Sequence, residues 1–511
     1  MTPRHAVPDR LVGLTSWHAD WSGLRVVILG LGATGFSVAD TLTELGADVL
    51  VVAESASDEY TRLVSVIGAT LFTGDLRHPP TEVIEHDPEL IVASPGFSPH
   101  HPMIEWATAQ MIPLWGDIEL AWRVRDKVGT PAEWMLVTGT NGKTTTVQLT
   151  ASIIAAAGHR VAPCGNIGVP VLDAVRDPQG FDVFVVELSS HQLHYLASTN
   201  AAVSPHSAVC LNIANDHLEW HGTFDAYRDA KARVYENTRV ACVYNKADAA
   251  TRTMVENAEV VEGARAIGFD LGIPGPSDLG VVDGILCDRA FLDDRRSSAL
   301  EIITLDELHA QGLAAPHVVA NILAASALAR AYGVPPETIK QALRGFSLDP
   351  HRIQLVLDHD GIRWINDSKA TNPHAADASL TAFESVVWVL GGLLKGVDIG
   401  PLIARHASRL RGAVIIGTEQ QAVTSALQRH APDIPVIEVD PAETETVMTR
   451  AVHAALGMAE PGDVVLLAPA AASLDQFTGY DQRGTYFAQA VNEIQGGGAD
   501  DQSEEPHRTE S

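Results

Sequence analysis

The stretch from Gly139 to Thr144 constrains the fold of this 511-residue chain more than any other. It reads Gly-Thr-Asn-Gly-Lys-Thr, follows the apolar run 134–137 and precedes a helical pattern over 147–157. A strand, a glycine-rich loop and a helix in this order are typical of a phosphate-binding loop, because glycines let backbone N–H groups approach phosphate oxygens and the helix N-terminus favours negative charge. We therefore predict a nucleotide site in which Lys143 contacts the phosphates and Thr144 contacts Mg²⁺.

The spacing departs from the usual pattern G-x-x-x-x-G-K-[ST], because Val137 stands where the first glycine is expected. An ordinary strand-to-helix turn could have a similar composition. The Lys-Thr pair that directly follows Gly142 at the start of a helix favours nucleotide binding over that alternative.

Composition narrows the class of protein. Lys and Arg total 35 against 64 Asp and Glu, a net charge of −29, which disfavours a nucleic-acid partner. No apolar run approaches the ~18 residues that span a bilayer, and the N-terminus lacks a signal-peptide pattern. The cysteines are scattered without C-x-x-C spacing, which argues against a disulfide framework and a zinc site. We expect a cytoplasmic monomer without membrane insertion.

Near the N-terminus, a G-x-G-x-x-G fingerprint from Gly30 to Gly35 lies between an apolar strand at 24–29 and a helical pattern at 36–45. A second strand at 47–53 ends beside Glu54, which completes a βαβ unit. Three interpretations stay open for this fingerprint: a nicotinamide dinucleotide site, a pyrophosphate site for another nucleotide, and a tight turn without a ligand. A later strand at 90–93 leads into the loop Ser94-Pro95-Gly96, where ligands of open α/β sheets bind.

Polar residues also follow strands in the middle of the chain. Glu187 ends the apolar run 181–187 and is a candidate Mg²⁺ ligand, although it could simply cap the next helix. The apolar strand at 207–211 leads to His217 at the same predicted edge, where an imidazole could complete a cation site. Asn166 follows a turn and could present an amide to a ligand. The basic helix at 227–233, which contains Lys231, could also be an ordinary solvated face.

The alternation of strands and helices predicts an α/β protein of three domains. We expect a Rossmann-like domain at 1–115, a central P-loop ATPase-like domain with a mostly parallel sheet at 116–347, and a doubly wound, dinucleotide-binding-like domain at 348–495. In the last domain, loops after three strands begin with small or polar residues, as at the ligand edge of a doubly wound sheet. The tail at 496–511 is Gly-rich and then acidic, which predicts disorder.

Taken together, these residues resemble the ATP-dependent Mur ligases of peptidoglycan synthesis over nearly the whole chain. The resemblance is carried by the stretches 139–145, 212–217, 227–236, 364–371, 473–477 and 482–484. It implies an amide ligase that uses ATP and Mg²⁺ at two sites. The carboxylate of UDP-N-acetylmuramoyl-L-alanine would attack the γ-phosphate, and the amine of D-glutamate would then attack the acyl phosphate. The N-terminal fingerprint is thereby reassigned from a dehydrogenase site to the UDP-substrate.

The resemblance also implies roles for individual residues. Catalysis would fall to Lys143, Glu187, His217 and Lys231, and metal binding to Thr144, Glu187, His217 and a carbamylated Lys231. ATP would be bound by Gly139, Thr140, Asn141, Gly142, Lys143, Thr144, Thr145, Asn321, Arg352 and Asp367. The UDP-substrate would be bound by Gly32, Ala33, Thr34, Ser94, Pro95, Gly96, Asn166 and Ser189. D-Glutamate would be bound by Lys369, Thr371, Lys395, Ser473, Leu474 and Tyr480.

Two alternatives remain at this point. The phosphate loop is also found in folylpolyglutamate synthase and in Mur ligases that add other amino acids, so another amide ligase on the same scaffold is possible. A non-catalytic protein that binds a dinucleotide through Gly30 to Gly35 is the alternative from another class. Dependence of ATP cleavage on both substrates distinguishes these readings.

Overall fold

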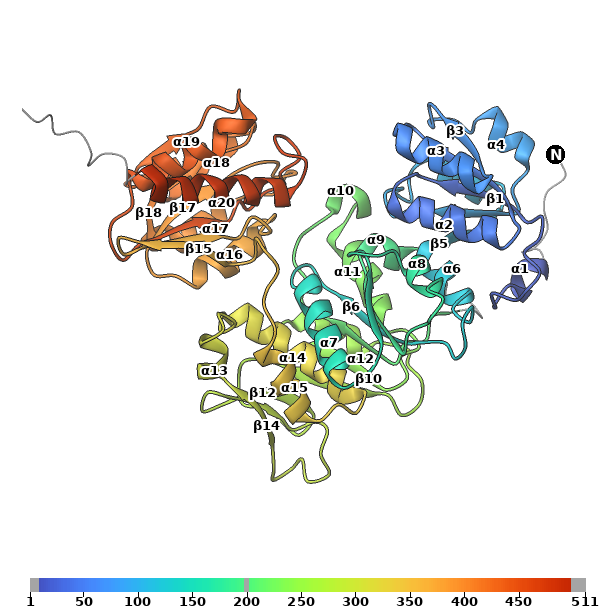
Figure 1. Cartoon of the computed structure of the whole chain (residues 1–511), viewed down its shortest axis with the longest axis horizontal. Helices are drawn as coiled ribbons and strands as arrows, with labels where there is room; N and C mark the ends of the chain where they lie inside the picture. The colour runs from blue at the N-terminus through green and yellow to red at the C-terminus, as the bar shows by residue number, and fades with distance from the viewer. Residues whose placement is uncertain (1–8, 197–201, 498–511) are drawn as a thin grey trace, which may run out of the picture. The chain divides into compact units, whose positions relative to one another are not determined.

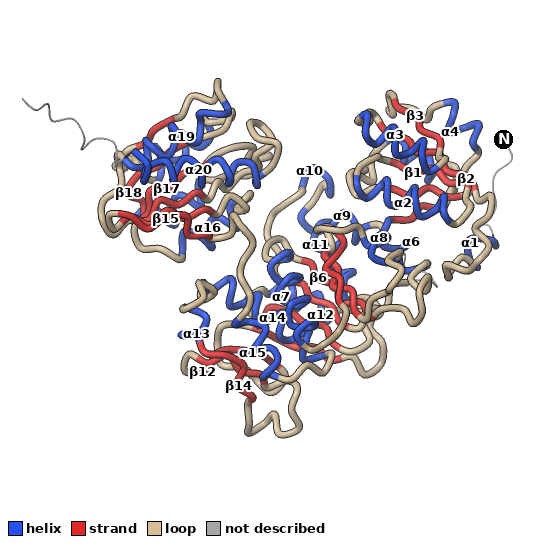
Figure 2. The backbone as a smooth tube through the Cα atoms, viewed as in Figure 1, coloured by secondary structure: helices blue, strands red, loops and turns tan. Residues whose placement is uncertain are grey.

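The structure is a computed structural model that describes residues 9–196 and 202–497 of the chain. The chain divides into two compact units, Met1–Phe346 and Ser347–Ser511. Their described residues form a five-stranded, a nine-stranded and a six-stranded sheet with flanking helices, which confirms the predicted α/β class (Figures 1 and 2). The predicted tail lies, from residue 498 onward, outside the described residues.

The first sheet has the order β3-β2-β1-β4-β5, and all its neighbouring strands are parallel. The order reverses between β1 and β4, so the loops after these strands flank the crevice where doubly wound sheets bind ligands. The strands are β1 (Arg25–Leu29), β2 (Asp48–Ala53), β3 (Thr70–Thr73), β4 (Leu90–Ala93) and β5 (Leu114–Gly116). The helices are α1 (Asp9–Gly13), α2 (Ala33–Glu44), α3 (Asp58–Ile67), α4 (Thr81–His86) and α5 (Pro102–Ala109).

The second sheet has the order β14-β13-β12-β11-β10-β9-β6-β8-β7. It is parallel from β7 to β12 and ends in an antiparallel extension. Its strands are β6 (Glu133–Thr138), β7 (Val161–Gly165), β8 (Val183–Glu187), β9 (Ser207–Cys210), β10 (Ala241–Asn245), β11 (Arg265–Phe269), β12 (Asp278–Val282), β13 (Ile285–Asp288) and β14 (Leu300–Thr304). Its helices are α7 (Lys143–Ala156), α8 (Val171–Val175), α9 (Ser190–His194), α10 (Leu218–His221), α11 (Phe224–Ala232), α12 (Ala249–Glu256), α13 (Leu305–His309), α14 (Pro316–Ala331) and α15 (Pro336–Arg344), with a 3-10 turn at Arg233–Tyr235.

The antiparallel extension contains a hairpin between β12 and β13. Asp283 and Gly284 connect the two strands and both have positive φ, 48° and 78°. Two consecutive positive φ angles match the twist of a tight hairpin, and Asp-Gly is a preferred pair there. The segment 280–286 thus belongs to two paired strands.

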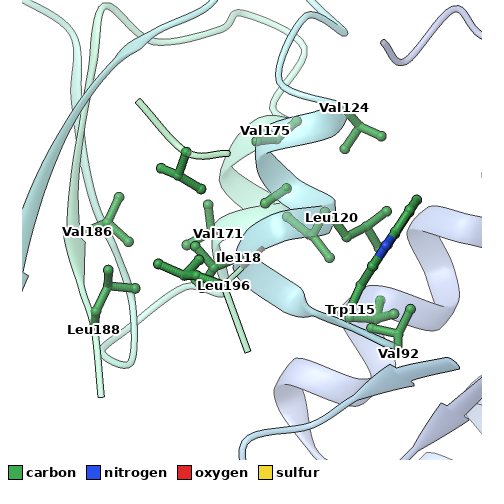
Figure 3. Packing of buried hydrophobic residues seen from close by; sticks show 14 of the residues in the cluster. Val92, Trp115, Ile118, Leu120, Val124, Val171, Val175, Val186, Leu188 and Leu196 are labelled. Atoms are coloured by element: carbon green, nitrogen blue, oxygen red, sulfur yellow. The ribbon is translucent and has the colours of Figure 1, made fainter. Parts of the chain in front are cut away.

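A continuous hydrophobic core joins the first sheet to the second within unit Met1–Phe346. Helix α6 (Asp117–Arg123) follows β5 directly and packs against α8. Figure 3 shows Ile118, Leu120 and Val124 of this region together with Trp115 and Val175, all in one buried cluster. Because burial of apolar surface is favourable, this cluster stabilises the connection between the two sheets.

The third sheet lies in unit Ser347–Ser511 and has the order β15-β16-β20-β17-β18-β19. Only β15 is antiparallel to its neighbour, and buried apolar clusters cover both faces of the sheet. The strands are β15 (Gln354–His359), β16 (Ile362–Asn366), β17 (Val386–Leu390), β18 (Leu410–Ile415), β19 (Val436–Glu438) and β20 (Val464–Leu467). The helices are α16 (Pro373–Thr381), α17 (Gly400–His406), α18 (Gln421–His430), α19 (Thr444–Leu456) and α20 (Tyr480–Gly497), with a 3-10 turn at Ala407–Arg409.

Within residues 9–196 and 202–497, every helix is too short or too polar to cross a bilayer.

Candidate active site

The predicted phosphate loop connects β6 to α7, which starts at Lys143. Gly139 and Gly142 have φ of 148° and 85°. A Cβ atom on Gly142 would lie 2.5 Å from Oδ1 of Asn321, on α14, so this position requires glycine for its conformation and for space. The structure thus brings Asn321 directly against the loop.

Two residues that the sequence did not assign to the site hold this loop in place. The carboxamide of Asn212 accepts a hydrogen bond from the backbone N–H of Asn141 at 2.9 Å and donates one to the carbonyl of Asn141 at 3.0 Å. The hydroxyl groups of Thr140 and Tyr227 lie 2.8 Å apart. Asn212 follows β9 just as Glu187 ends β8, and this position after a strand was the signal that could have identified it.

The side chain of Lys143 turns back over the loop. Its Nζ donates hydrogen bonds to the carbonyls of Gly139 at 3.0 Å and Thr140 at 2.9 Å. The cation therefore lies within the loop that would surround a phosphate group, as the sequence pattern predicts.

Glu187 ends β8, the neighbour of β6, and its side chain is buried. Its Oε1 accepts a hydrogen bond from Nδ2 of Asn166 at 3.0 Å. Within the described part of the chain, Oε2 is buried and has no hydrogen-bond partner. An unpaired buried carboxylate oxygen is costly, so a cation at this oxygen would relieve the cost. The geometry fits a metal ligand better than a helix cap.

Lys231, on α11, is another buried charged group beside the loop. Only 2% of its surface is exposed, and its Nζ donates hydrogen bonds to Oγ1 of Thr138 at 3.2 Å and to the carbonyl of Gly139 at 3.0 Å. Burial, with the nearby charge of Lys143, lowers the pKa of Lys231 to about 7. A substantial fraction of this amine is therefore uncharged and nucleophilic at neutral pH.

His217 has φ of 51° and directly precedes α10. Strand β9 ends at Cys210, so a loop rather than the strand end itself carries His217. Its Nε2 lies 3.5 Å from Oδ2 of Asp216, and its ring lies 4.7 Å from the ring of His191. The imidazole is thus placed by its loop and by an aromatic neighbour.

Among the described residues, the acidic, histidine and cysteine side chains do not form a metal site by themselves. Across residues 9–196 and 202–497, no group of three or more of them is arranged to hold a metal ion. A cation at Oε2 of Glu187 would need other donors, and a hydroxyl group such as that of Thr144 is a donor of another kind.

In the first sheet, the glycine fingerprint and the Ser94 loop lie next to each other. A Cβ on Gly30 would lie 3.0 Å from Cβ of Ser94, and one on Gly35 would lie 2.1 Å from the carbonyl oxygen of Gly30. The glycines therefore let α2 begin close to the ends of β1 and β4. This arrangement brings Gly32, Ala33 and Thr34 to the same edge of the sheet as Ser94, Pro95 and Gly96.

Ser189 caps α9, because its Oγ accepts a hydrogen bond from the N–H of Gln192 at 3.1 Å. Gln192 in turn donates from Nε2 to Oδ2 of Asp117 at 2.9 Å, and the hydroxyl of Tyr195 donates to the carbonyl of Phe97 at 2.6 Å. Helix α9 therefore connects the second sheet to residues that follow β4 and β5 of the first.

The predicted D-glutamate residues follow three adjacent parallel strands of the third sheet. Lys369 and Thr371 follow β16, Lys395 follows β17, and Ser473, Leu474 and Tyr480 follow β20, the strand between the other two. The loops after β17 and β20 also exchange two backbone hydrogen bonds, at 2.9 and 3.0 Å, between Leu393 and Ala472. All six residues therefore lie at one edge of this sheet.

Asp367 and Lys369 have defined surroundings at this edge. Oδ1 of Asp367 accepts a hydrogen bond from the N–H of Ile353 at 3.2 Å, and Oδ2 accepts one from the hydroxyl of Ser379. Burial raises the pKa of Asp367 to about 6, and the charge of Arg352 opposes this shift. Nζ of Lys369 lies 3.7 Å from the centroid of the Tyr480 ring, a cation–π contact. The ligands assigned to all these residues stay predictions.

Three family descriptions match the chain. "Mur ligase MurD-like, N-terminal domain" matches residues 24–116, "Mur ligase middle domain" matches 137–329, and "Mur ligase, glutamate ligase domain" matches 351–471. Each match contains most of the strands of one of the sheets described above.

Curated relatives and solved structures agree with these matches. The chain is 65% identical over 98% of both chains to UDP-N-acetylmuramoylalanine–D-glutamate ligase of Leifsonia xyli subsp. xyli. It is 50% identical to the Streptomyces coelicolor protein of the same name, over 93% of this chain and 99% of the relative. The UDP-N-acetylmuramate-alanine ligase of Thermotoga maritima has a similar fold, with a TM-score of 0.52 at 18% identity over 92% of this chain and 99% of the other.

Proposed function

The chain belongs to the Mur ligase family, and from this premise we propose that it joins D-glutamate to UDP-N-acetylmuramoyl-L-alanine while it cleaves ATP to ADP and phosphate. The observation that carries this proposal is the 65% identity, over 98% of both chains, to a relative named for that reaction. The amide product is a precursor of peptidoglycan.

The reaction consists of two transfers. The carboxylate of the alanyl group attacks the γ-phosphorus of ATP, ADP leaves, and an acyl phosphate forms. The amine of D-glutamate then attacks the acyl carbon, loses a proton and expels phosphate. Lys143 and the backbone N–H groups of 139–145 stabilise the charge on the transferred phosphoryl group, and bound substrates keep water from the acyl phosphate.

Mg²⁺ would supply further charge neutralisation at the phosphate oxygens. We propose two sites for it, one with Thr144 and Glu187 as ligands and one with His217 and Lys231. The buried, unpaired Oε2 of Glu187 supports the first site. In the second, an ammonium group at Lys231 would repel the cation.

Carbamylation of Lys231 would remove that repulsion. The neutral amine forms a bond to the carbon of CO₂ and releases a proton, which converts a cation into an anionic ligand. Burial of Lys231 next to Lys143 supports this proposal, because two adjacent ammonium groups in a buried site disfavour each other.

The remaining substrate contacts follow the positions of the loops. The crevice between β1 and β4 would take the uridine diphosphate, with Asn166 and Ser189 toward the muramoyl-alanine portion. Arg352 and Asp367 would contact ATP. D-Glutamate carries two carboxylates, which match the two lysines, Lys369 and Lys395, and the hydroxyl groups at the edge of the third sheet.

These assignments divide the chain by task. Residues 1–115 would bind the UDP-substrate, 116–347 would bind ATP and 348–495 would bind the amino acid. Because one chain then carries every site, we propose a monomer. Since ATP and the nucleotide-linked sugar are cytoplasmic metabolites, we also place the enzyme in the cytoplasm.

Identification of the product tests the proposed function. The protein is incubated with ATP, Mg²⁺, UDP-N-acetylmuramoyl-L-alanine and D-glutamate, and the product is analysed by chromatography and mass spectrometry. We expect one new amide, formed in proportion to ADP. A product built from another amino acid in preference would favour a different amide ligase, and binding without turnover would favour a dinucleotide-binding protein.

A further inference from the structure

Arg483, near the start of α20, has a charged side chain with only 1% of its surface exposed, which is unusual for an arginine. Its Nε donates a hydrogen bond to Oγ of Ser368 at 3.0 Å, and its Nη2 donates one to the carbonyl of Ser368 at 2.8 Å. Its Nη1 donates to the carbonyl of Ala471 at 3.2 Å. The guanidinium therefore joins the loop after β16 to the loop after β20.

Both loops carry residues of the proposed amino-acid site. Ser368 directly precedes Lys369, and Ala471 lies just before Ser473. The hydroxyl of Ser368 also donates a hydrogen bond to the carbonyl of Tyr480 at 2.7 Å, and the ring of Tyr480 lies under Lys369. Three of the predicted D-glutamate contacts thus depend on one buried cluster for their relative positions.

The hydrogen bonds around Ser368 and Arg483 extend to the end of β16. Asn366 ends β16 and is fully buried, and its Nδ2 donates hydrogen bonds to the carbonyl of Gly484 at 2.9 Å and to Nδ1 of His351 at 2.9 Å. Its Oδ1 accepts from the N–H of Ser368 at 3.2 Å. The start of α20 is therefore held against the end of β16 by Asn366 as well as by Arg483.

We infer that Arg483 is a positioning residue for the amino-acid substrate, because it sets the spacing between the loops that carry Lys369, Ser473 and Tyr480. This inference rests on the proposed function. It concerns the geometry of the site, since the buried guanidinium donates its hydrogen bonds to protein oxygens.

The shape of the guanidinium explains why arginine stands there. A planar fork donates in fixed directions to several acceptors at once, whereas a lysine ammonium is a single point on a flexible stem. Burial lowers the pKa of Arg483 to about 9, so the group stays charged at neutral pH. Placing a charge in a buried site is costly, and the hydrogen bonds to three oxygens offset that cost.

Two substitutions test the inference in the full-length enzyme. Arg483→Lys keeps the charge but cannot span both loops, and Ser368→Ala removes one acceptor without adding bulk. We expect the KM for D-glutamate to rise about tenfold or more in Arg483→Lys and about threefold in Ser368→Ala. The KM values for ATP and for the nucleotide substrate, and kcat at saturating D-glutamate, should stay within about threefold of the wild type.

Ser385→Ala is the matched control. Ser385 directly precedes β17 and donates a hydrogen bond to Oδ1 of Asp463, which precedes β20, at 2.5 Å. The substitution therefore removes a partly buried hydroxyl contact from the opposite edge of the same sheet. We expect this variant to lower thermal stability without changing the KM for D-glutamate. If Arg483→Lys and Ser385→Ala changed all three KM values alike, the inference would be overturned.

Hydrogen exchange separates this inference from the proposed function. The N–H groups of Ala470 and Ala472 donate to the carbonyls of Ala370 and Leu393 at 2.9 and 3.0 Å, so their exchange reports whether the loops remain together. We expect faster exchange of both amides in Arg483→Lys and unchanged exchange in Ser385→Ala. Wild-type protein that shows no D-glutamate-dependent turnover would contradict the proposed function, whereas unchanged exchange in Arg483→Lys would contradict the positioning role.

Discussion

The side-chain carboxamide of Asn212 makes two hydrogen bonds to the backbone of Asn141. Its Oδ1 accepts from the N–H at 2.9 Å, and its Nδ2 donates to the carbonyl at 3.0 Å. Asn212 lies two residues beyond the end of β9, and it thereby fixes the middle of the phosphate loop that follows β6, the neighbour of β9 in the sheet. The loop geometry is set by a strand end rather than by the loop sequence alone.

Removing that support should weaken ATP binding. Asn212→Ala deletes two hydrogen bonds, a loss of about 1–3 kcal/mol, so we expect the KM for ATP to rise about tenfold. Asn245→Ala is the matched control, because Asn245 donates to the carbonyl of Leu211 at 3.0 Å from the end of β10 without touching the loop. Steady-state kinetics with varied ATP measures both. Equal KM values in the two variants would argue against the role of Asn212.

Lys143 should be required for turnover. Its cation lies within the phosphate loop, so Lys143→Ala removes charge stabilisation at the transferred group, and we expect kcat to fall by more than about a hundredfold. Lys340→Ala serves as the control, since it removes a lysine whose ion pair lies elsewhere. Nζ of Lys340, on α15, lies 2.9 Å from Oε2 of Glu307, on α13. Phosphate release is the readout. Full activity in Lys143→Ala would show that the phosphate loop was assigned wrongly.

The carbamylation proposal for Lys231 predicts a chemical rescue. Lys231→Ala should be inactive, and a small free carboxylate such as acetate should restore part of the activity, because it can occupy the place of the carbamate. The same carboxylate should not restore Lys143→Ala. Labelled bicarbonate should also give a carbamate signal in the wild type by NMR. Absence of both the rescue and the signal would refute the proposal.

Asp117 should make stability depend on pH. Burial raises its pKa from 3.8 to about 6. The folded protein thus binds this proton more tightly than the unfolded chain does, so the stabilisation is complete below about pH 4 and is lost as the pH rises through about 6. The full difference is about 3 kcal/mol.

Asp117→Asn should remove this dependence, because its side chain stays neutral. Relative to the wild type, we expect the variant to gain up to about 3 kcal/mol in free energy of unfolding between about pH 4 and pH 7. Denaturant unfolding across this range measures the gain, with the exposed Asp48→Asn as control. A difference that is constant with pH would contradict the raised pKa.

The fold class and the phosphate loop were predictable from sequence because both depend on local patterns. Alternation of apolar strands with helices predicts an α/β fold, and the glycine-rich loop at 139–142 connects β6 to α7, which begins with Lys143 and Thr144. The hairpin at Asp283 and Gly284 also has a local signal, which is the Asp-Gly pair between the apolar residues of β12 and β13.

The supporting contacts were not predictable in the same way. The insertion of β20 between β16 and β17 brings Lys369, Lys395 and Ser473 to one edge, and strand order is a property of the whole sheet. Arg483 is buried although most arginines are exposed, and nothing in its sequence neighbourhood indicates that. Asn212 contacts Asn141 across two strands that are distant in the chain.

A substrate-panel assay of phosphate release tests the central claim most directly. The protein is mixed with ATP and Mg²⁺ and with each combination of UDP-N-acetylmuramoyl-L-alanine, D-glutamate, L-glutamate and meso-diaminopimelate. We predict rapid phosphate release only when UDP-N-acetylmuramoyl-L-alanine and D-glutamate are both present. No release with that pair, or equal release with L-glutamate or meso-diaminopimelate, would contradict the claim that this chain is a D-glutamate-adding ligase.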